Sequence, residues 1–103
     1  MYNVDWSGLR FEWDERKNAV NQKKHGISFQ EAMSVFADEN ALFLLDPDHS
    51  ETEERYLLLG LSATLSLVVV SHCYRSRDEV IRIVSARRAT RRERAQYHQR
   101  WAQ

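Results

Sequence analysis

The segment that decides the fold is Val80-Ile-Arg-Ile-Val-Ser-Ala-Arg-Arg-Ala-Thr90. Its first part is rich in β-branched residues, which favours a strand over residues 79–86. Thr90 and Glu93 have the spacing of a capping box, in which each side chain accepts a hydrogen bond from the other residue's backbone N–H. The pattern predicts that a helix over residues 91–101 follows the strand directly.

Arginine side chains gather along this strand and at the corner after it. Arg82 stands among apolar residues, where a guanidinium is costly to bury unless it meets an anion. Arg87 and Arg88 follow at the end of the strand. We therefore expect the corner to present arginines to a phosphate or a carboxylate, and an internal salt bridge is the structural alternative for Arg82.

The residues before this segment predict further elements of one α+β domain. Asp14 and Gly26 have the positions of an N-cap and a C′ residue around a polar helix. Ser28 and Glu31 repeat the capping-box pattern at a second helix. The predicted helices cover 15–25, 29–37 and 91–101, and the predicted strands cover 11–13, 41–45, 55–63, 65–74 and 79–86.

Short connections between successive strands predict an antiparallel sheet. Two helices precede most of this sheet and one follows it, so we expect the helices to pack on one face. The 103 residues have room for a single core, which makes residues 1–103 one domain. No apolar run has the length of a membrane span, and we expect a soluble, cytoplasmic protein with no membrane partner.

The formal net charge is zero, but the charge is unevenly distributed. Residues 75–103 hold nine arginines and three acidic residues, a net charge of +6, and residues 1–74 carry −6. A local basic surface, rather than the net charge, is what meets a phosphate backbone, so a zero total does not exclude a nucleic-acid partner. The use of arginine without lysine in the basic part favours planar, bidentate recognition.

The side chains available for chemistry are arginines, histidines and carboxylates. The four histidines lack the paired spacing of metal ligands, and the single cysteine, Cys73, lies in an apolar stretch, so we expect no metal site and no cofactor. Such a set can cleave RNA without a metal ion. A base removes the 2′-hydroxyl proton, the oxygen attacks the neighbouring phosphorus, and cations stabilise the developing charge.

His49 and the pair Glu54–Arg55 are candidates within and beside the acidic stretch 46–54. The carboxylates around His49 favour its imidazolium form. Structural explanations stay open for each candidate: a solvated surface histidine for His49 and an ion pair for Arg55. They also stay open for His25, which could cap a helix, and for His72, which could be a satisfied core residue.

Several separated motifs occur along the chain in a fixed order. They are Phe11-Glu-Trp-Asp14, Lys17, Asn21, Lys24-His-Gly26, Ser28-Phe29, Glu54-Arg55, Gly60, and Arg82-Ile-Val-Ser-Ala-Arg-Arg-Ala-Thr90 with Glu93 and Tyr97. In this order they resemble the BrnT family, the ribonuclease toxins of bacterial type II toxin–antitoxin pairs. The similarity runs from residue 11 to residue 97, so residues 1–10 are expected to be an N-terminal extension.

The resemblance implies a compact fold like that of the RelE toxins, with two N-terminal helices, an antiparallel sheet and one C-terminal helix. It also implies a metal-independent endoribonuclease that inhibits translation and growth. On the matching positions we expect a catalytic set of Arg82, Arg55, His49 and Glu54, and an RNA-binding set of Lys23, Lys24, His25, Arg87 and Arg88.

The resemblance further implies a cognate ribbon-helix-helix antitoxin that neutralises the toxin in a hetero-oligomer. RNA would be the substrate, and operator DNA would be reached only through the antitoxin. A different class of function stays open beside this one. The chain could be a non-catalytic, arginine-rich binding module that acts only as antitoxin partner and corepressor.

Overall fold

The computed structural model describes residues 3–4, 8–46, 54–75, 77 and 79–99. None of the helices in this part is long and apolar enough to cross a membrane. The elements in chain order are β1 (Asn3–Val4), β2 (Arg10–Glu12), α1 (Glu15–His25), α2 (Phe29–Ser34), the 3₁₀ turn η1 (Val35–Ala37), β3 (Leu42–Leu45), β4 (Tyr56–Leu61), β5 (Leu67–Arg75), β6 (Val80–Arg88) and α3 (Arg91–Gln99).

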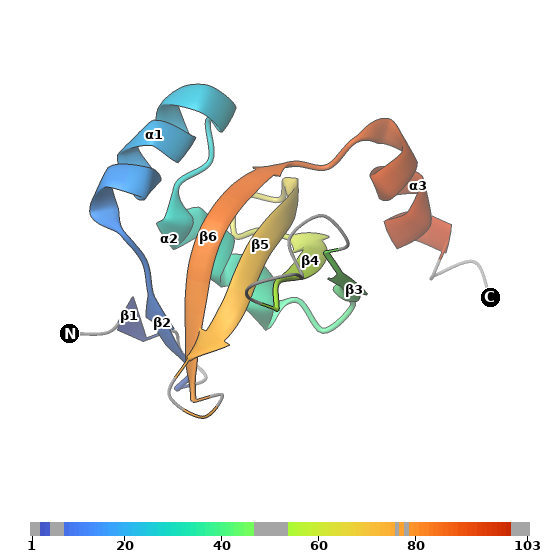
Figure 1. The fold of residues 1–103 in the computed structure, drawn as a ribbon. Helices are drawn as coiled ribbons and strands as arrows, with labels where there is room; N and C mark the ends of the chain where they lie inside the picture. The colour runs from blue at the N-terminus through green and yellow to red at the C-terminus, as the bar shows by residue number, and fades with distance from the viewer. Residues whose placement is uncertain (1–2, 5–7, 47–53, 76, 78, 100–103) are drawn as a thin grey trace.

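The strands form one mixed sheet in the order β1-β2-β6-β5-β4-β3 (Figure 1). Strands β3 to β6 are antiparallel neighbours, as their short connections predict. The expectation of a wholly antiparallel sheet is wrong for β2, which lies parallel to β6. The connection between these two strands contains both N-terminal helices and three strands, so no hairpin fixes their relative direction.

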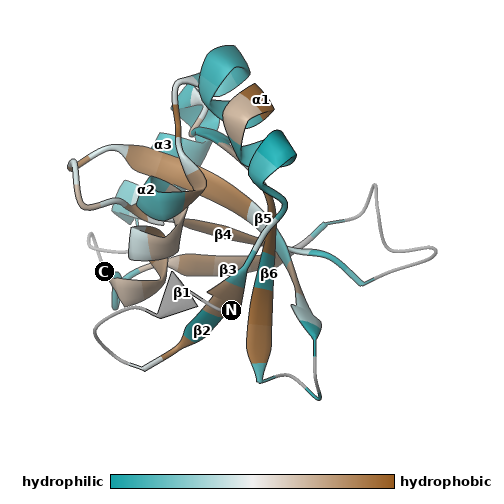
Figure 2. Ribbon diagram, turned by 90° about the vertical axis from the view of Figure 1, so that its left-hand side faces the viewer, coloured by the Kyte–Doolittle hydropathy of each residue, from teal (hydrophilic) through white to brown (hydrophobic). Residues whose placement is uncertain are grey.

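Helices α1 and α2 pack on one face of the sheet, where most of the core lies (Figures 1 and 2). Val68 and Val70 of β5 point into this core together with Phe29 of α2. Val69 points to the other side, where it packs with Leu59 and Tyr97. The C-terminal helix therefore covers one end of the opposite face, and the expectation that all helices share a face is wrong for α3. We call this second side of β4, β5 and β6 the open face.

The predicted caps of α1 and α3 are present. The Asp14 carboxylate accepts hydrogen bonds from the backbone N–H groups of Arg16 at 2.8 Å and Lys17 at 3.4 Å. Gly26 closes α1 with φ of 72°, a left-handed conformation that suits glycine. At α3 the capping box is complete, because Thr90 N donates to Glu93 Oε1 at 2.8 Å and Glu93 N donates to Thr90 Oγ1 at 3.2 Å.

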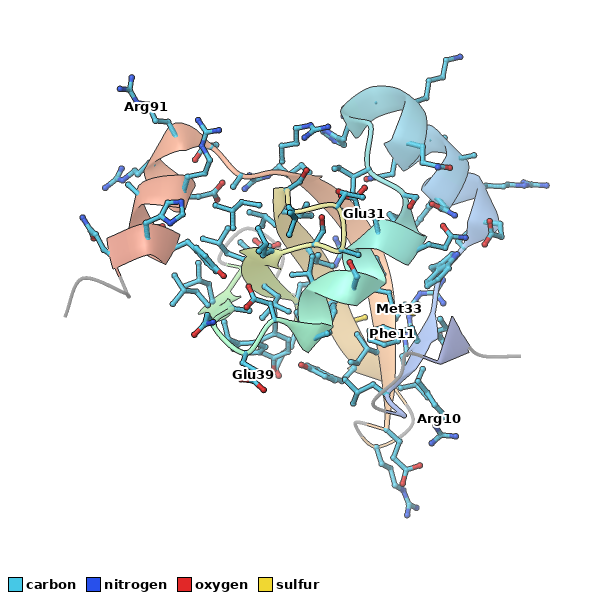
Figure 3. The ribbon with its side chains drawn as sticks, turned by 180° about the vertical axis from the view of Figure 1, so that it is seen from behind. Arg10, Phe11, Glu31, Met33, Glu39 and Arg91 are labelled. Atoms are coloured by element: carbon cyan, nitrogen blue, oxygen red, sulfur yellow. The ribbon has the colours of Figure 1, made fainter. Side chains whose placement is uncertain are left out.

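The second predicted capping box is only half formed. Ser28 Oγ accepts from Glu31 N at 3.0 Å, as expected. The Glu31 carboxylate, however, accepts from the hydroxyl groups of Ser62 and Thr64, both at 2.7 Å (Figure 3 shows Glu31 on α2). These hydroxyls belong to the β4–β5 turn, so the carboxylate holds that turn against α2 instead of closing its own helix.

A buried asparagine joins α1 to the edge of β6. The parallel pairing with β2 stops at Arg82, and among the described residues no strand continues the sheet on that side beyond it. Asn21 supplies the missing partner: its Nδ2 donates to Ala86 O at 2.8 Å, and its Oδ1 accepts from Ala86 N at 3.1 Å. The same Nδ2 donates to Ile27 O at 2.8 Å. One side-chain amide thus satisfies three backbone groups in the interior.

Replacing Asn21 by alanine should therefore lower the free energy of unfolding by on the order of 2–4 kcal/mol, because three backbone groups are left without their partner. Gln22→Ala is the matched control, since it removes an exposed amide from the neighbouring position and should change stability by less than about 0.5 kcal/mol. Urea denaturation followed by circular dichroism measures both. Equal stability of the two variants would contradict the role of Asn21.

The Glu93 carboxylate should make stability depend on acid pH. Hydrogen bonds from Arg87 are the main reason why the pKa of Glu93 falls from its ordinary 4.5 to about 2. Because its pKa is lower in the folded state, the ionised Glu93 carboxylate stabilises the fold fully above pH 4.5. This stabilisation disappears as the pH falls through about 2. Because the Arg87 side chain is 40% exposed, solvent screening reduces this contribution to about 1–2 kcal/mol.

Glu93→Gln keeps an acceptor for Thr90 N but removes the charge. The unsubstituted protein should be the more stable of the two at pH 6, and the difference should vanish as the pH approaches 2. Denaturation curves collected across this range provide the measurement. A difference that stays constant from pH 6 to pH 2 would show that the ionised carboxylate contributes nothing.

Candidate active site on the open face of the sheet

A cavity of about 370 Å³ opens on the open face between β4, β5 and β6. Successive side chains of a strand point to opposite faces of the sheet, and residues paired across strands share a face. The pairing register therefore decides which side chains meet in the cavity. Val69 is paired with Arg87, and Ser71 lies between Leu57 and Ser85. The lining residues are Asp46, Arg55, Leu57, Val69, Ser71, Val84, Ser85 and Arg87.

A β-bulge in β6 shapes the floor of this cavity. Ser71 is paired with Ser85, but the next residue, His72, is paired with Ile83, which leaves Val84 as the extra residue. A bulge bends its strand and re-aims the side chains around it. As a result the consecutive residues Val84 and Ser85 both line the cavity.

Arg87 is held in one orientation by Glu93. Its Nη1 donates to Oε1 at 2.7 Å and its Nη2 donates to Oε2 at 3.0 Å, and these bonds raise the pKa of Arg87. Nη1 also donates to Arg88 O at 3.4 Å. Nε–H and the second hydrogen of Nη2 have no acceptor among the described residues. These two donors project side by side, in the spacing that suits two oxygens of one phosphate.

Arg55 enters the same cavity from the other side, next to Asp46. The backbone N–H of Asp46 donates to Arg55 O at 3.1 Å, so the two residues lie together on either side of segment 47–53. Glu54 is exposed and accepts a hydrogen bond from the Tyr56 hydroxyl at 2.7 Å, and it does not line the cavity. His49 lies outside the described residues.

Arg82 lies on the open face but is engaged by a carboxylate. Its strand neighbour is Glu12, and Nη1 donates to Glu12 Oε2 at 2.6 Å. Both side chains are partly shielded, with exposed fractions of 29% for Arg82 and 26% for Glu12. The internal salt bridge that sequence reasoning gave as the alternative for Arg82 is therefore present, and Arg82 does not line the cavity.

The residues predicted to bind RNA fall into separate places. Lys24 and His25 line a second hollow, of about 320 Å³, between α1 and β6, which we call the α1 hollow. Lys23 is exposed on the same helix but is not part of that lining. Arg88 lines a third, smaller hollow together with Arg94 at the start of β5 and α3. Only Arg87 of this set lines the open-face cavity.

His72 and Cys73 belong to the interior. His72 is fully buried beside Phe36, with ring centroids 4.9 Å apart, and its Nδ1 lies 3.1 Å from Val70 O. Burial lowers the pKa of His72, which favours a neutral ring. Cys73 is also buried, as expected for a small core residue. In the described part of the chain, no three His, Cys, Asp or Glu side chains come together as a set that could hold a metal ion.

Sequence reasoning missed several lining residues. Ser71 carries no motif, and Asp46 and Ser85 stand inside longer stretches without being singled out there. The three meet only because the strands pair in this register with a bulge. Arg16 and Lys17 on α1 also line the α1 hollow. Their signal is present in the sequence, since residues 16–17, 20–21 and 24–25 follow each other at four-residue spacing and share a helix face.

Comparisons with known proteins agree with this architecture. A comparison with curated proteins finds no match. The crystal structure of the Brucella abortus ribonuclease toxin BrnT is similar, with a TM-score of 0.59 at 23% identity, over 79% of this chain and 96% of that one. This likeness supports the fold. The model of a family described as "Ribonuclease toxin, BrnT, of type II toxin-antitoxin system" matches residues 13–93. Because the match covers most of the sequence, the chain belongs to the BrnT family of ribonuclease toxins.

Proposed function

We propose that this protein is a metal-independent endoribonuclease of the cytoplasm whose scissile phosphate binds in the open-face cavity. The observation that carries the proposal is that Arg55, directly before β4, and Arg87 of β6 line one hollow with Ser71 and Ser85. Two guanidinium groups supply positive charge where a ribonuclease must stabilise a phosphorane. Membership of a ribonuclease toxin family agrees with this chemistry.

Arg87 is the group best prepared to bind the phosphate. Glu93 fixes its guanidinium through one pair of donors and leaves Nε–H and Nη2–H for a substrate. A cation that is already oriented does not reorganise when charge develops, which makes its stabilisation of the transition state larger. Arg55 would contact the same phosphate from the side of β4, and the serine hydroxyls could donate to its remaining oxygens.

Proton transfer is proposed for the stretch 46–54, which begins and ends beside the cavity. Asp46 lines the cavity with a buried carboxylate, and His49 follows it by three residues. Glu54 precedes Arg55 directly. One of these groups would take the 2′-hydroxyl proton as general base, and another would protonate the leaving 5′-oxygen.

The proposed reaction forms the bond from the 2′-oxygen to phosphorus and breaks the bond from phosphorus to the 5′-oxygen. Its products are a 2′,3′-cyclic phosphate and a free 5′-hydroxyl, and no electron is transferred. The arginines would hold the non-bridging oxygens as negative charge accumulates on them.

Arg82 is proposed to have a smaller effect than Arg55 and Arg87. Its salt bridge with Glu12 offsets part of its charge, and it stands outside the cavity lining. It lies on the same face of β6, where its field still reaches a phosphate bound nearby. A single activity assay compares the three arginines.

Purified protein should cleave single-stranded RNA equally well with and without EDTA. Arg87→Ala and Arg55→Ala should each lower the rate by about 10²–10³-fold, because each removes one oriented cation from the transition state. Arg87→Lys should be impaired less, since lysine keeps the positive charge but lacks the paired N–H donors of the guanidinium. Arg82→Ala should be impaired less than either alanine variant in the cavity. Gel analysis of cleavage, with folding checked by circular dichroism, gives the rates.

The matched control is Arg77→Asn, which removes an exposed charge from the β5–β6 turn. Arg77 has φ of 58°, a left-handed conformation that asparagine tolerates. If both cavity variants cleave as fast as this control, the proposed site is wrong. Loss of activity in EDTA that Mg²⁺ restores would reject metal independence. If the unsubstituted protein cleaves no RNA under any condition, the chain is a binding module and corepressor instead.

The partner proposed for this chain is a cognate ribbon-helix-helix antitoxin. A free ribonuclease toxin would damage its host's RNA, and the family is one of type II toxin–antitoxin systems. Acidic side chains of an antitoxin could occupy the cavity as the phosphate does, because both carry oxygens that a guanidinium fork recognises. Operator DNA would then be bound through the antitoxin.

Mixing this protein with the ribbon-helix-helix protein encoded beside it should abolish RNA cleavage at equimolar concentration. The complex should shift operator DNA in a gel, and the toxin chain alone should not. Size-exclusion chromatography measures complex formation in the same samples. Full cleavage activity in a complex that is shown to form would contradict blocking of the site, and an operator shift by the toxin chain alone would contradict indirect DNA binding.

A further inference from the structure

The open-face cavity and the α1 hollow adjoin each other. Val84 and Ser85, the residues at the bulge of β6, line both of them. The parallel strand β2 pairs with β6 only as far as Arg82. Helix α1 lies next to β6 (Figure 1), and its residues share a hollow with Val84 and Ser85 at the bulge. A ligand that crosses β6 at the bulge would therefore leave one hollow and enter the other without passing over a neighbouring strand.

The α1 hollow is basic and has no acidic residue in its lining. Arg16, Lys17 and Lys24 are exposed, and none of them forms an ion pair within the described part of the chain. Val20, Asn21 and His25 complete the helix side of the hollow. Three cations on one helix face, none of them in an ion pair among the described residues, are a surface on which phosphates can be bound by charge.

We propose that the α1 hollow is a second phosphate-binding subsite, and that the substrate is an extended single strand of RNA that crosses β6 at Val84–Ser85. This inference rests on the proposed function, because it places the scissile phosphate at Arg55 and Arg87. The flanking phosphates lie on Lys17, Lys24 and Arg16. An RNA too short to span the open-face cavity and the α1 hollow cannot use both subsites.

The chemistry of the lining favours contacts with the RNA backbone. Neither hollow has a Phe, Tyr or Trp side chain among its described lining residues, so stacking on such rings contributes nothing here. Ammonium and guanidinium groups bind any phosphate irrespective of the base attached to it. The α1 hollow should thus add affinity and strong salt dependence to substrate binding, with little sequence preference of its own.

The test measures binding of a fully 2′-O-methylated RNA of about twelve nucleotides, which keeps every phosphate but lacks the attacking hydroxyl. Affinity is determined by fluorescence anisotropy over a range of salt concentrations. For single strands, each phosphate that the protein neutralises adds about 0.7 to the steepness of log K against log salt. Lys24→Ala should therefore reduce the steepness by about 0.7, and the double variant with Lys17→Ala by about 1.4. Both positions are exposed on a helix, where alanine preserves folding.

Two further variants control for charge. Arg77→Asn removes one positive charge far along the sequence from α1 and should leave the slope unchanged. Lys23→Ala removes the neighbouring charge on the same helix, and its slope should change less than that of Lys24→Ala, because Lys24 lines the hollow and Lys23 does not. A slope that changes equally for all single variants would show a diffuse charge effect and overturn the inference.

Cleavage separates this inference from the proposed function. The double variant should cleave a long RNA more slowly than the unsubstituted protein, and should cleave a dinucleotide at the same rate. If the double variant binds and cleaves the long RNA like the unsubstituted protein, the second subsite is wrong while the active site stands. If cleavage of both substrates is insensitive to Arg87→Ala and Arg55→Ala, the proposed function itself fails, and the path across β6 fails with it.

Discussion

The Asn21 amide is the interaction on which the arrangement of the other parts depends. It bonds both backbone groups of Ala86 and thereby holds α1 against β6 at this position. Beyond Arg82, β6 has no strand on its β2 side within the part of the chain that the structure describes, and α1 residues lie beside the bulge at Val84 instead. The same contact turns the basic face of α1 towards the bulge. One buried side chain thus determines both the limit of the sheet and the position of the cations beside it.

The Glu93 carboxylate has two roles, because it caps α3 and also orients Arg87. Its carboxylate completes the cap of α3 through Thr90 N and at the same time accepts both Nη groups of Arg87. The helix that closes one end of the open face is therefore anchored by the group that orients Arg87, the cation proposed to bind the scissile phosphate. This dual use explains physically why a strand, a capping box and an arginine pair stand so close together in the sequence.

Local signals predicted much of this structure. The caps at Asp14, Gly26 and Thr90, and the strands with short connections, depend on neighbouring residues, so the sequence shows them directly. The parallel pairing of β2, the partner of Arg82 and the bonds of Asn21 to Ala86 depend on residues about 65–70 positions away, which no local pattern reveals. The residues of the candidate site likewise include some that the sequence predicted and some that it did not. Arg55 and Arg87 were expected from motifs, whereas Asp46, Ser71 and Ser85 join them only through strand register and the bulge.

We propose above all that the oriented guanidinium of Arg87 receives the scissile phosphate. A crystal structure of the protein with a 2′-O-methylated RNA strand tests it most directly, because the uncleaved phosphate stays in place. We expect two phosphate oxygens at hydrogen-bond distance from Nε and Nη2 of Arg87, with Glu93 still bound to Nη1 and Nη2 on the other edge of the guanidinium. An RNA phosphate bound elsewhere, with the cavity between β4, β5 and β6 empty, would contradict it.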